Sequence, residues 1–493
     1  MKLWTNGFFH TLENESDVHH HMITQDGHIV CLGDEALNMP YTEVVDLNHG
    51  HVYPGFVDAH MHLLGYGQML SRPNLTGVKD KDRVIKQLKE HFKSEALFAE
   101  GYFECGLTKH DLNKISIETP IMVRHNDYHS LTVNDAVLNQ MHLQHDTGIL
   151  TEAVAQQAMD TFPKYTHEGL KTLLIKAIES LYRYGITGAH SDDLYYFNGF
   201  FDTIKAFEEV LEHYPFRAHL LMHHHTVKDF IKSNKPFLDQ HKYLQLGAVK
   251  MFYDGTLSSK TALMVYPYKD SEDKGLNVNG YETFVSYVQM ARSYHLPVAI
   301  HVIGDQGLEE VLDILEKYPP KEGVYDRLIH TPWVKKGTLE RLKQMHLTTD
   351  IQPQFLSSDL PWALSYMSKT PDLIFPWKSL LSTGINLAGS SDAPVETPNP
   401  LLGMYAAIER VSDHDHKTYQ PEEKLTRYEA LKLYTTYANY STQKKNRGLL
   451  KEGFVCDLTV FEQDLLHIPI QKFKTNPVLM TVVDEHIVYK KEI

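Results

Sequence analysis

The chain has 493 residues, of which 42% are hydrophobic and 23% charged, a balance typical of globular proteins with a large core. Its formal net charge of −15 and its lack of a long basic run argue against nucleic acid as a partner, because an acidic surface repels phosphate. No stretch approaches the ~18 consecutive apolar residues of a membrane-spanning helix, so we expect no membrane partner.

The chain begins with short β-type segments. Asp26-Gly27 in "MITQDGHIVCLGD" separates two runs rich in apolar residues, which is a strong hairpin pattern. The C-terminal end is similar, because "CDLTVFEQD" and "VLMTVVDEHIVYKK" are rich in β-forming residues, the second with a turn at "DE". Since chain ends often lie close together, we predict a small composite β-sandwich domain from residues 1–52 and 445–493.

Residues 53–444 have a different pattern, in which short β-type runs are followed by amphipathic stretches such as "EGLKTLLIKAIESLYRYG" and "GLEEVLDILEKY". Strands that alternate with helices indicate parallel βαβ units, and eight units predict a closed (β/α)8 TIM barrel of the α/β class. The eight β-type runs are residues 53–60, 185–191, 216–224, 246–254, 297–305, 327–334, 347–355 and 385–394.

The interval between the first two runs is too long for one connection. It spans about 125 residues, whereas a whole βαβ unit needs about 30. The interval contains the helix-like "DRVIKQLKEHF" and the strand-like "ALFAEGYFE" and "TPIMVRHND". We therefore predict an inserted subdomain at about residues 66–165, after the first barrel strand.

The cysteines limit both the compartment and the metal chemistry. Cys31, Cys105 and Cys456 are odd in number and lack CxxC spacing, which argues against a disulfide framework and against a thiolate zinc site. The N-terminal "MKLWTNGFFHTLENE" becomes polar too soon for a signal peptide. We therefore expect a cytoplasmic protein in which nitrogen and oxygen ligands hold any metal.

The polar residues at the strand ends are the candidate site, because barrel active sites lie at the C-terminal ends of the strands. His60 and His62 end the first run, and alternation along a strand places them on one face. Two histidines are too few for a hydrolytic metal, which needs three or four ligands and an open position. The other strand ends offer Lys250, His301, His330 and Asp392.

Each candidate also has a structural explanation. A single histidine at a strand end is more often a hydrogen-bonded structural residue, and Asp392 could cap a following helix. Lys250, within the apolar "GAVKMF", is harder to explain, because a buried ammonium is costly without a partner. Six such residues at the strand ends of one barrel are difficult to attribute to chance, so the pattern favours a shared site.

The motifs around these residues resemble those of a known family. "PGFVDAHMH" resembles the first-strand motif of the amidohydrolase superfamily. "VKMFYDGTLSSKTAL", "AIHVIGDQGLEEVLD" and "SSDAPVETPNPLLGMYAAIER" resemble its amidohydrolase-3 branch, which includes the YtcJ-like proteins and N-substituted formamide deformylase. "RHNDYHSLTVNDAVL" resembles the inserted region of that branch. The resemblance covers nearly the whole chain, including the split β domain.

The resemblance implies a role for each candidate. His60 and His62 match a pair that binds the more buried metal, and His301 and His330 match the ligands of a second metal. Lys250 matches a lysine that bridges two metals once CO2 has converted it to a carbamate. Asp392 matches an aspartate that binds metal and moves a proton. The implied cofactors are one or two divalent ions, most simply zinc, and the carbamate of Lys250.

The resemblance also implies the reaction. We expect an enzyme that hydrolyses a C–N bond in an amide, N-substituted formamide or cyclic amide, with metal-activated hydroxide as nucleophile and Asp392 as proton shuttle. One alternative keeps this site but acts on an ester, a carbamate or a ring-deamination substrate. An alternative from another class is a catalytically silent amidohydrolase-like scaffold, although all six ligand positions are filled.

Three further residues are weaker candidates for substrate contact. These are His129 in the inserted region, Asp254 directly after the lysine strand, and Trp333 after the sixth run. Asp254 could equally end its strand in a turn, and Trp333 could be ordinary packing. Beyond a small-molecule substrate, we expect a second copy of the chain as partner, in a homodimer. The triple histidine at 19–21 is interpreted as surface composition.

Overall fold

The computed structural model describes residues 1–126, 130–238 and 242–492. The chain forms two compact units, one made by Met1–Leu63 with Ile178–Ile493 and the other by Leu64–Ala177. Among the described residues, no helix combines the length and the apolar character needed to cross a bilayer.

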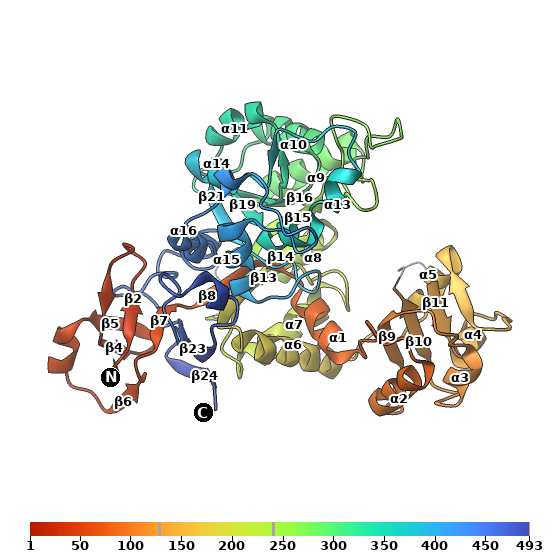
Figure 1. The fold of residues 1–493 in the computed structure, drawn as a ribbon, viewed down its shortest axis with the longest axis horizontal. Coiled ribbons are helices and arrows are strands. Elements are labelled where there is room, and N and C mark those ends of the chain that lie inside the picture. Colours follow the sequence, from red (N-terminus) through yellow and green to blue (C-terminus); the bar gives the residue numbers. More distant parts are fainter. Residues whose placement is uncertain (127–129, 239–241, 493) are drawn as a thin grey trace. The chain divides into compact units, whose positions relative to one another are not determined.

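A barrel of eight parallel strands forms the centre of the first unit (Figure 1). Its strands are β8 (Phe56–Met61), β13 (Ile186–Ser191), β14 (Arg217–His223), β15 (Leu244–Phe252), β16 (Val298–Val302), β17 (Asp326–His330), β19 (Leu347–Ile351) and β21 (Asn386–Gly389). They are hydrogen-bonded in the order β21-β19-β17-β16-β15-β14-β13-β8. The His62 N–H donates to Ala393 O and the Asp392 N–H donates to His60 O, each over 2.8 Å, so β8 and β21 meet at their C-terminal ends. The predicted barrel is confirmed, with one barrel strand in each predicted run.

The barrel strands are buried along their length because both of their faces are covered. Every residue of β8, β14 and β17 is buried, which is expected of parallel strands between a barrel interior and a helical layer. The helices instead bury one face. In α10 (Asp305–Lys317), Leu308, Val311, Leu312 and Leu315 are buried at the spacing of one helical stripe.

The first unit contains further short elements around the barrel. Trp333–Val334 (β18) pairs with Leu373–Ile374 (β20) in a two-stranded sheet. The other helices are α7 (Phe200–Leu211), η2 (His224–Thr226), α8 (Val227–Ser233), α9 (Tyr281–Ser293), α11 (Lys336–Lys343), α12 (Pro353–Asp359), α13 (Trp362–Ser365), α14 (Trp377–Ser382), α15 (Pro400–Glu409), η3 (Pro421–Glu423), α16 (Arg427–Leu433), α17 (Thr436–Tyr440) and α18 (Ile470–Phe473).

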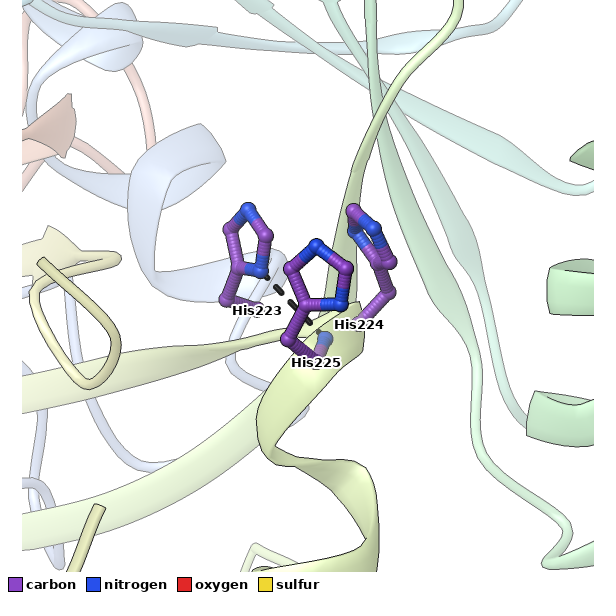
Figure 2. A group of neighbouring side chains, drawn as sticks. All are labelled: His223, His224 and His225. Carbon is purple, nitrogen blue, oxygen red and sulfur yellow. Dashed lines mark hydrogen bonds between the residues drawn. The ribbon is translucent and has the colours of Figure 1, made fainter. Parts of the chain in front are cut away.

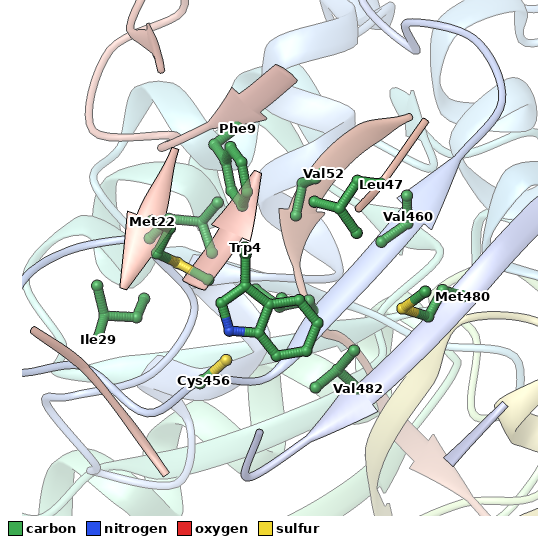
Figure 3. Packing of buried hydrophobic residues seen from close by; sticks show 12 residues of the cluster. Trp4, Phe9, Met22, Ile29, Leu47, Val52, Cys456, Val460, Met480 and Val482 are labelled. Carbon is green, nitrogen blue, oxygen red and sulfur yellow. The ribbon is translucent and has the colours of Figure 1, made fainter. Parts of the chain in front are cut away.

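Both ends of the chain build a β sandwich, as predicted. One sheet has the order β5-β4-β1-β6 and the other β24-β23-β22-β7-β2-β3. A shared core of buried residues from both sheets surrounds Trp4, whose indole N–H donates to Thr24 Oγ1 over 3.0 Å (Figure 3). The predicted domain boundaries at 52 and 445 stay a prediction. The elements are β1 (Lys2–Thr5), β2 (Phe8–His10), β3 (Val18–His19), β4 (Met22–Gln25), β5 (His28–Leu32), η1 (Asp34–Asn38), β6 (Glu43–Asp46), β7 (His51–Pro54), β22 (Leu458–Phe461), β23 (Val478–Val483) and β24 (His486–Lys490).

Two tight turns set the register of hairpins in this sandwich. β4 and β5 are antiparallel on either side of Asp26-Gly27, which have φ of 51° and 77°. β23 and β24 are joined in the same way by Asp484-Glu485, with φ of 54° and 61°. Two successive residues with positive φ match the twist of the flanking strands, so both predicted turns are confirmed.

The second unit is the inserted subdomain, which is confirmed as a separate α/β layer structure. Its four strands have the order β12-β11-β10-β9. Alternate residues of the strands pack into two different clusters, so Leu97 and Ala99 face one cluster while Phe98 faces the other. Its elements are α1 (Leu63–Ser71), α2 (Lys81–His91), β9 (Leu97–Tyr102), α3 (Lys109–Asn113), β10 (Ile121–His125), β11 (Ser130–Val133), α4 (Asp135–Gln140), β12 (Ile149–Thr151), α5 (Glu152–Asp160) and α6 (His167–Tyr182).

Candidate metal centre

A cavity of about 400 Å³ lies at the C-terminal ends of the barrel strands. Five strands or the loops directly after them contribute polar side chains to it. The residues predicted as metal ligands all line this one cavity: His60, His62, Lys250, His301, His330 and Asp392. The barrel therefore brings together positions that are up to 332 residues apart in the sequence.

His60, His62 and Asp392 present three ligand atoms to one point. Asp392 Oδ1 lies 3.5 Å from His60 Nε2 and 3.3 Å from His62 Nε2. A tetrahedral ion with bonds of ~2.0–2.1 Å holds its ligand atoms about 3.3 Å apart, so the spacing fits a metal. Asp392 Oδ1 is also buried and has no hydrogen-bond partner among the described residues, although buried oxygens are normally satisfied.

A buried carboxylate, Asp192 at the end of β13, supports two of these residues. Its Oδ1 lies 2.6 Å from His62 Nδ1 and its Oδ2 lies 3.4 Å from Lys250 Nζ. Burial alone would lower the pKa of His62, but Asp192 and Asp392 raise that pKa well above its usual value. Burial alone would raise the pKa of Asp192, but the charges of Lys250 and His62 outweigh it and lower that pKa. Asp192 thus orients His62 with Nε2 toward Asp392. It also forms an ion pair with the buried ammonium of Lys250.

His301 and His330 face each other with unprotonated nitrogens. His301 Nδ1 and His330 Nε2 are 2.9 Å apart. The other nitrogen of His301, Nε2, lies 3.1 Å from the Gly255 carbonyl oxygen, and His330 Nδ1 lies 2.7 Å from Gln352 Oε1. Both of these outer nitrogens must carry a hydrogen to bond to an oxygen acceptor. A neutral imidazole has only one N–H, so the two nitrogens that face each other both present lone pairs.

The neighbours of Gln352 fix this assignment. The Gln352 amide nitrogen donates to Asp350 O over 3.2 Å and to Ser390 Oγ over 2.9 Å, so the amide oxygen must face His330. Burial lowers the pKa of His301 well below its usual value and that of His330 to about 4, so neither is an imidazolium near neutral pH. Two facing lone pairs repel each other unless a cation lies between them. The donor set therefore fits a second metal position.

The backbone at this site is held in an unusual conformation. His330 has φ of 78°, Thr331 of 44° and Asp392 of 56°, although none of them is glycine. Such residues cost about 1–3 kcal/mol each and persist where the surrounding structure requires them, which is common at active sites. Two of the six predicted ligands therefore occupy strained positions.

The three weaker candidates have different surroundings. Trp333, in β18, lines the cavity. Asp254 is buried outside the cavity lining, where it accepts hydrogen bonds from the backbone N–H groups of Leu263, Ile303 and Gly304 over 2.7–2.9 Å. It joins the loops that follow β15 and β16. His129 lies outside the described residues, so its predicted contact with substrate stays a prediction.

Two residues of the site were missing from the sequence prediction, namely Asp192 and Gln352. Both follow barrel strands from which the prediction took no residue, β13 and β19. The rule that polar residues at strand ends form the site would have found both, had it been applied to "GITGAHSDD" and "LTTDIQPQF".

A second group of histidines lies at the same end of the barrel. His223 ends β14, directly beside Lys250 in the strand register, and His224 and His225 follow in η2. Figure 2 shows their three rings side by side, with the His225 backbone N–H donating to His223 Nδ1 over 3.3 Å. Ring centroids are 4.1–5.0 Å apart. We call this group the triple-histidine cluster.

Comparison with known proteins agrees with the geometry. A family model described as "Amidohydrolase family" matches residues 43–489. YtcJ of Bacillus subtilis, which its name describes as an amidohydrolase, is 34% identical over 99% of this chain and 99% of its own length. N-substituted formamide deformylase of Arthrobacter pascens is 21% identical over 95% of each chain.

A solved structure extends the likeness to three dimensions. The uncharacterized metal-dependent hydrolase from Pyrococcus horikoshii matches with a TM-score of 0.84 and 25% identity, over 95% of this chain and 99% of that chain. The family match spans the barrel and the sandwich strands from β6 onward, and it includes all six residues at the cavity. The chain therefore belongs to the amidohydrolase family, a family of hydrolytic enzymes.

Proposed function

We propose that the protein is a metal-dependent hydrolase that cleaves a C–N bond in a small amide, N-substituted formamide or cyclic amide. The observation that carries the proposal is the 2.9 Å approach of His301 Nδ1 and His330 Nε2, two lone pairs that need a cation between them. The names of two relatives, an amidohydrolase and a formamide deformylase, support an amide as the substrate.

We assign the ligands as the resemblance implies. His60, His62 and Asp392 would hold one divalent ion, and His301 and His330 a second. Imidazole and carboxylate ligands suit zinc. A carboxylated Lys250 would supply an oxygen ligand next to His60, since Lys250 Nζ lies 3.2 Å from His60 Nε2.

Different residues of the chain then have different roles in hydrolysis. When bound, a divalent ion supplies a Lewis acid that makes water acidic near neutral pH and polarises a carbonyl. Asp392 accepts the proton of the attacking water on its carboxylate and returns that proton to the leaving nitrogen. Asp192 holds His62 in place, while Trp333 and Phe375, with ring centroids 5.4 Å apart, form part of an apolar wall that shields the reaction from water.

The experiment that tests this function compares the wild-type enzyme with Asp392→Asn on a panel of formamides, acyl amides, cyclic amides and esters. Zinc content is measured in both proteins by mass spectrometry. We expect wild-type turnover on an amide and a loss of about 10²–10⁴-fold in kcat for the variant. Equal turnover by both proteins would overturn the role of Asp392. Turnover of esters alone, or of nothing by a zinc-loaded protein, would overturn the proposed function.

A further inference from the structure

The cavity wall beyond the six predicted ligands contains five aromatic residues. Two of its residues are fixed by specific contacts. The Trp362 indole N–H donates to Ser358 O over 2.8 Å, and the Phe355 ring stacks on His330 with centroids 6.1 Å apart. The aromatic residues that line the cavity are Phe252, Trp333, Phe355, Trp362 and Phe375. Aromatic faces carry partial negative charge and attract cations.

Two carboxylates interrupt this aromatic wall. Asp359 lies one helical turn after Phe355 at the end of α12, and Glu396 lies in the loop after β21. Both are half-buried, and both contact the hydroxyl of Ser358, with Ser358 Oγ 3.4 Å from Asp359 Oδ1. Burial and the negative charge of Glu396 raise the pKa of Asp359 to about 7, and burial also raises the pKa of Glu396. The two half-buried carboxylates therefore repel each other, with little water to screen their charges.

Within the described part of the chain, no lysine or arginine of the cavity lining forms an ion pair with these acids. Among the described residues that line it, Lys250 is the only lysine or arginine, and Asp192 lies 3.4 Å from its ammonium. His414 acts on Asp359 from outside the lining and only partly offsets the effect of burial.

We propose that the part of the cavity formed by Phe355, Trp362, Asp359 and Glu396 binds a cationic nitrogen, a protonated or quaternary amine, on the substrate. The aromatic faces and the two carboxylates each favour a positive charge, and a cation would relieve the repulsion between the acids. The statement that this cation belongs to the substrate rests on the proposed function. The binding of the cation does not, because it depends only on these four side chains.

The test uses a matched pair of probes on the zinc-loaded enzyme. Choline carries a trimethylammonium group, and 3,3-dimethylbutan-1-ol has the same shape with carbon in place of the charged nitrogen. Dissociation constants are measured at pH 8 from tryptophan fluorescence, because Trp333 and Trp362 line the cavity. We expect choline to bind about tenfold more tightly than the neutral alcohol.

The decisive variant is the isosteric double substitution Asp359→Asn with Glu396→Gln. We expect it to reduce the preference for choline at least threefold, because only the aromatic faces remain to favour the charge, while the affinity for the neutral alcohol changes by less than about twofold, which also shows that the cavity is intact. Glu340→Gln removes one exposed carboxylate in α11, outside the cavity lining, and should keep the preference, because exposed charges are screened.

The outcomes separate the two proposals. Equal affinity for both probes in the wild type, failure of choline to bind, or a double variant whose preference for choline equals that of the wild type would overturn the cation site. An enzyme that hydrolyses amides but shows no preference for choline would keep the proposed function and lose only this inference. An enzyme that prefers choline but hydrolyses nothing would keep the cation site and lose the proposed function.

Discussion

Two groups of histidines lie at the C-terminal end of the same barrel, and their charged neighbours differ. In the first group, His60 and His62 share the carboxylate of Asp392 at 3.3–3.5 Å, and Asp192 lies 2.6 Å behind His62. In the triple-histidine cluster, the rings contact one another, and Tyr195 stacks on His223 with centroids 4.4 Å apart. Within the described part of the chain, no carboxylate forms a hydrogen bond with any of its three imidazoles.

This difference changes the pKa of His62, whereas burial and the charge of Lys250 lower the pKa of His60 well below its usual value. The carboxylates raise the pKa of His62 well above its usual value against the effect of burial. In the triple-histidine cluster, burial followed by the neighbouring imidazoles lowers the pKa of His223 to about 3 and that of His224 to about 4. The comparison favours the first group as the proposed cation site, because two imidazoles and a carboxylate oxygen converge there, whereas the imidazoles of the triple-histidine cluster pack against one another.

The largest expected effect separates the two groups directly. His60→Asn should lose its bound zinc and lower kcat/KM by more than about 100-fold, because removal of a ligand costs more than removal of its supporting residue. The matched variant His225→Asn should change either quantity by less than about twofold, because the triple-histidine cluster is not part of the proposed centre. Zinc analysis and steady-state turnover of both variants check this. A His225→Asn enzyme that loses one equivalent of zinc would break the comparison.

A smaller effect on zinc binding is expected for Asp192, which supports His62 of the first group. Asp192→Asn keeps the shape of the side chain but removes the charge that faces His62 and Lys250. We expect zinc affinity to fall about 10–100-fold, as is usual when the carboxylate behind a ligating histidine is lost. Competition with a fluorescent zinc chelator measures this, and thermal unfolding of the metal-free protein controls for misfolding. Unchanged affinity would show that Asp192 serves Lys250 alone.

The smallest effect concerns stability and should arise from the triple-histidine cluster. The folded-state pKa of His224 is about 4 against its usual 6.5, so the unfolded chain binds more protons between these values. The neutral imidazole therefore contributes stability above pH 6.5 that is lost as the pH falls toward 4. His224→Phe, which keeps an aromatic ring against Tyr287, should reduce the loss between pH 7 and 5 by an amount on the order of 1 kcal/mol.

Urea unfolding at both pH values measures this stability difference, and turnover at pH 7 serves as the control. We expect the variant to be as active as the wild type. The same acid-dependent loss in both proteins would show that His224 does not titrate with folding, and the contrast between the two groups would then rest on geometry alone.

Much of the fold was predictable because its signals are local. The Asp26-Gly27 turn, the eight buried β-type runs and the amphipathic stripe of α10 are each contained within a few neighbouring residues. The inserted subdomain was predictable for another reason, because about 125 residues cannot form a single βαβ connection. The roles of the six ligands and the substrate contacts stay predictions that the variants above address.

The strand-end rule points to the positions of Asp192 and Gln352, but it does not give their roles, because those depend on what their side chains face. Asp192 is 130 residues from His62, and the amide of Gln352 is oriented by Ser390 from the next strand of the barrel. No local pattern distinguishes a carboxylate that orients a histidine from one that ends a strand. Asp254 illustrates this limit, since it follows a barrel strand but accepts three backbone N–H groups outside the cavity lining.

By itself, the sequence determined the order of eight barrel strands and the residue types at their ends, because periodicity and strand ends are properties of consecutive residues. It also placed His60 and His62 on one face. Only the tertiary structure decided which nitrogen of each imidazole is free and which acids lie in the aromatic wall. The physical reason is that hydrogen bonds and burial fix protonation and orientation, and both depend on side chains that the closed barrel brings together from distant parts of the chain.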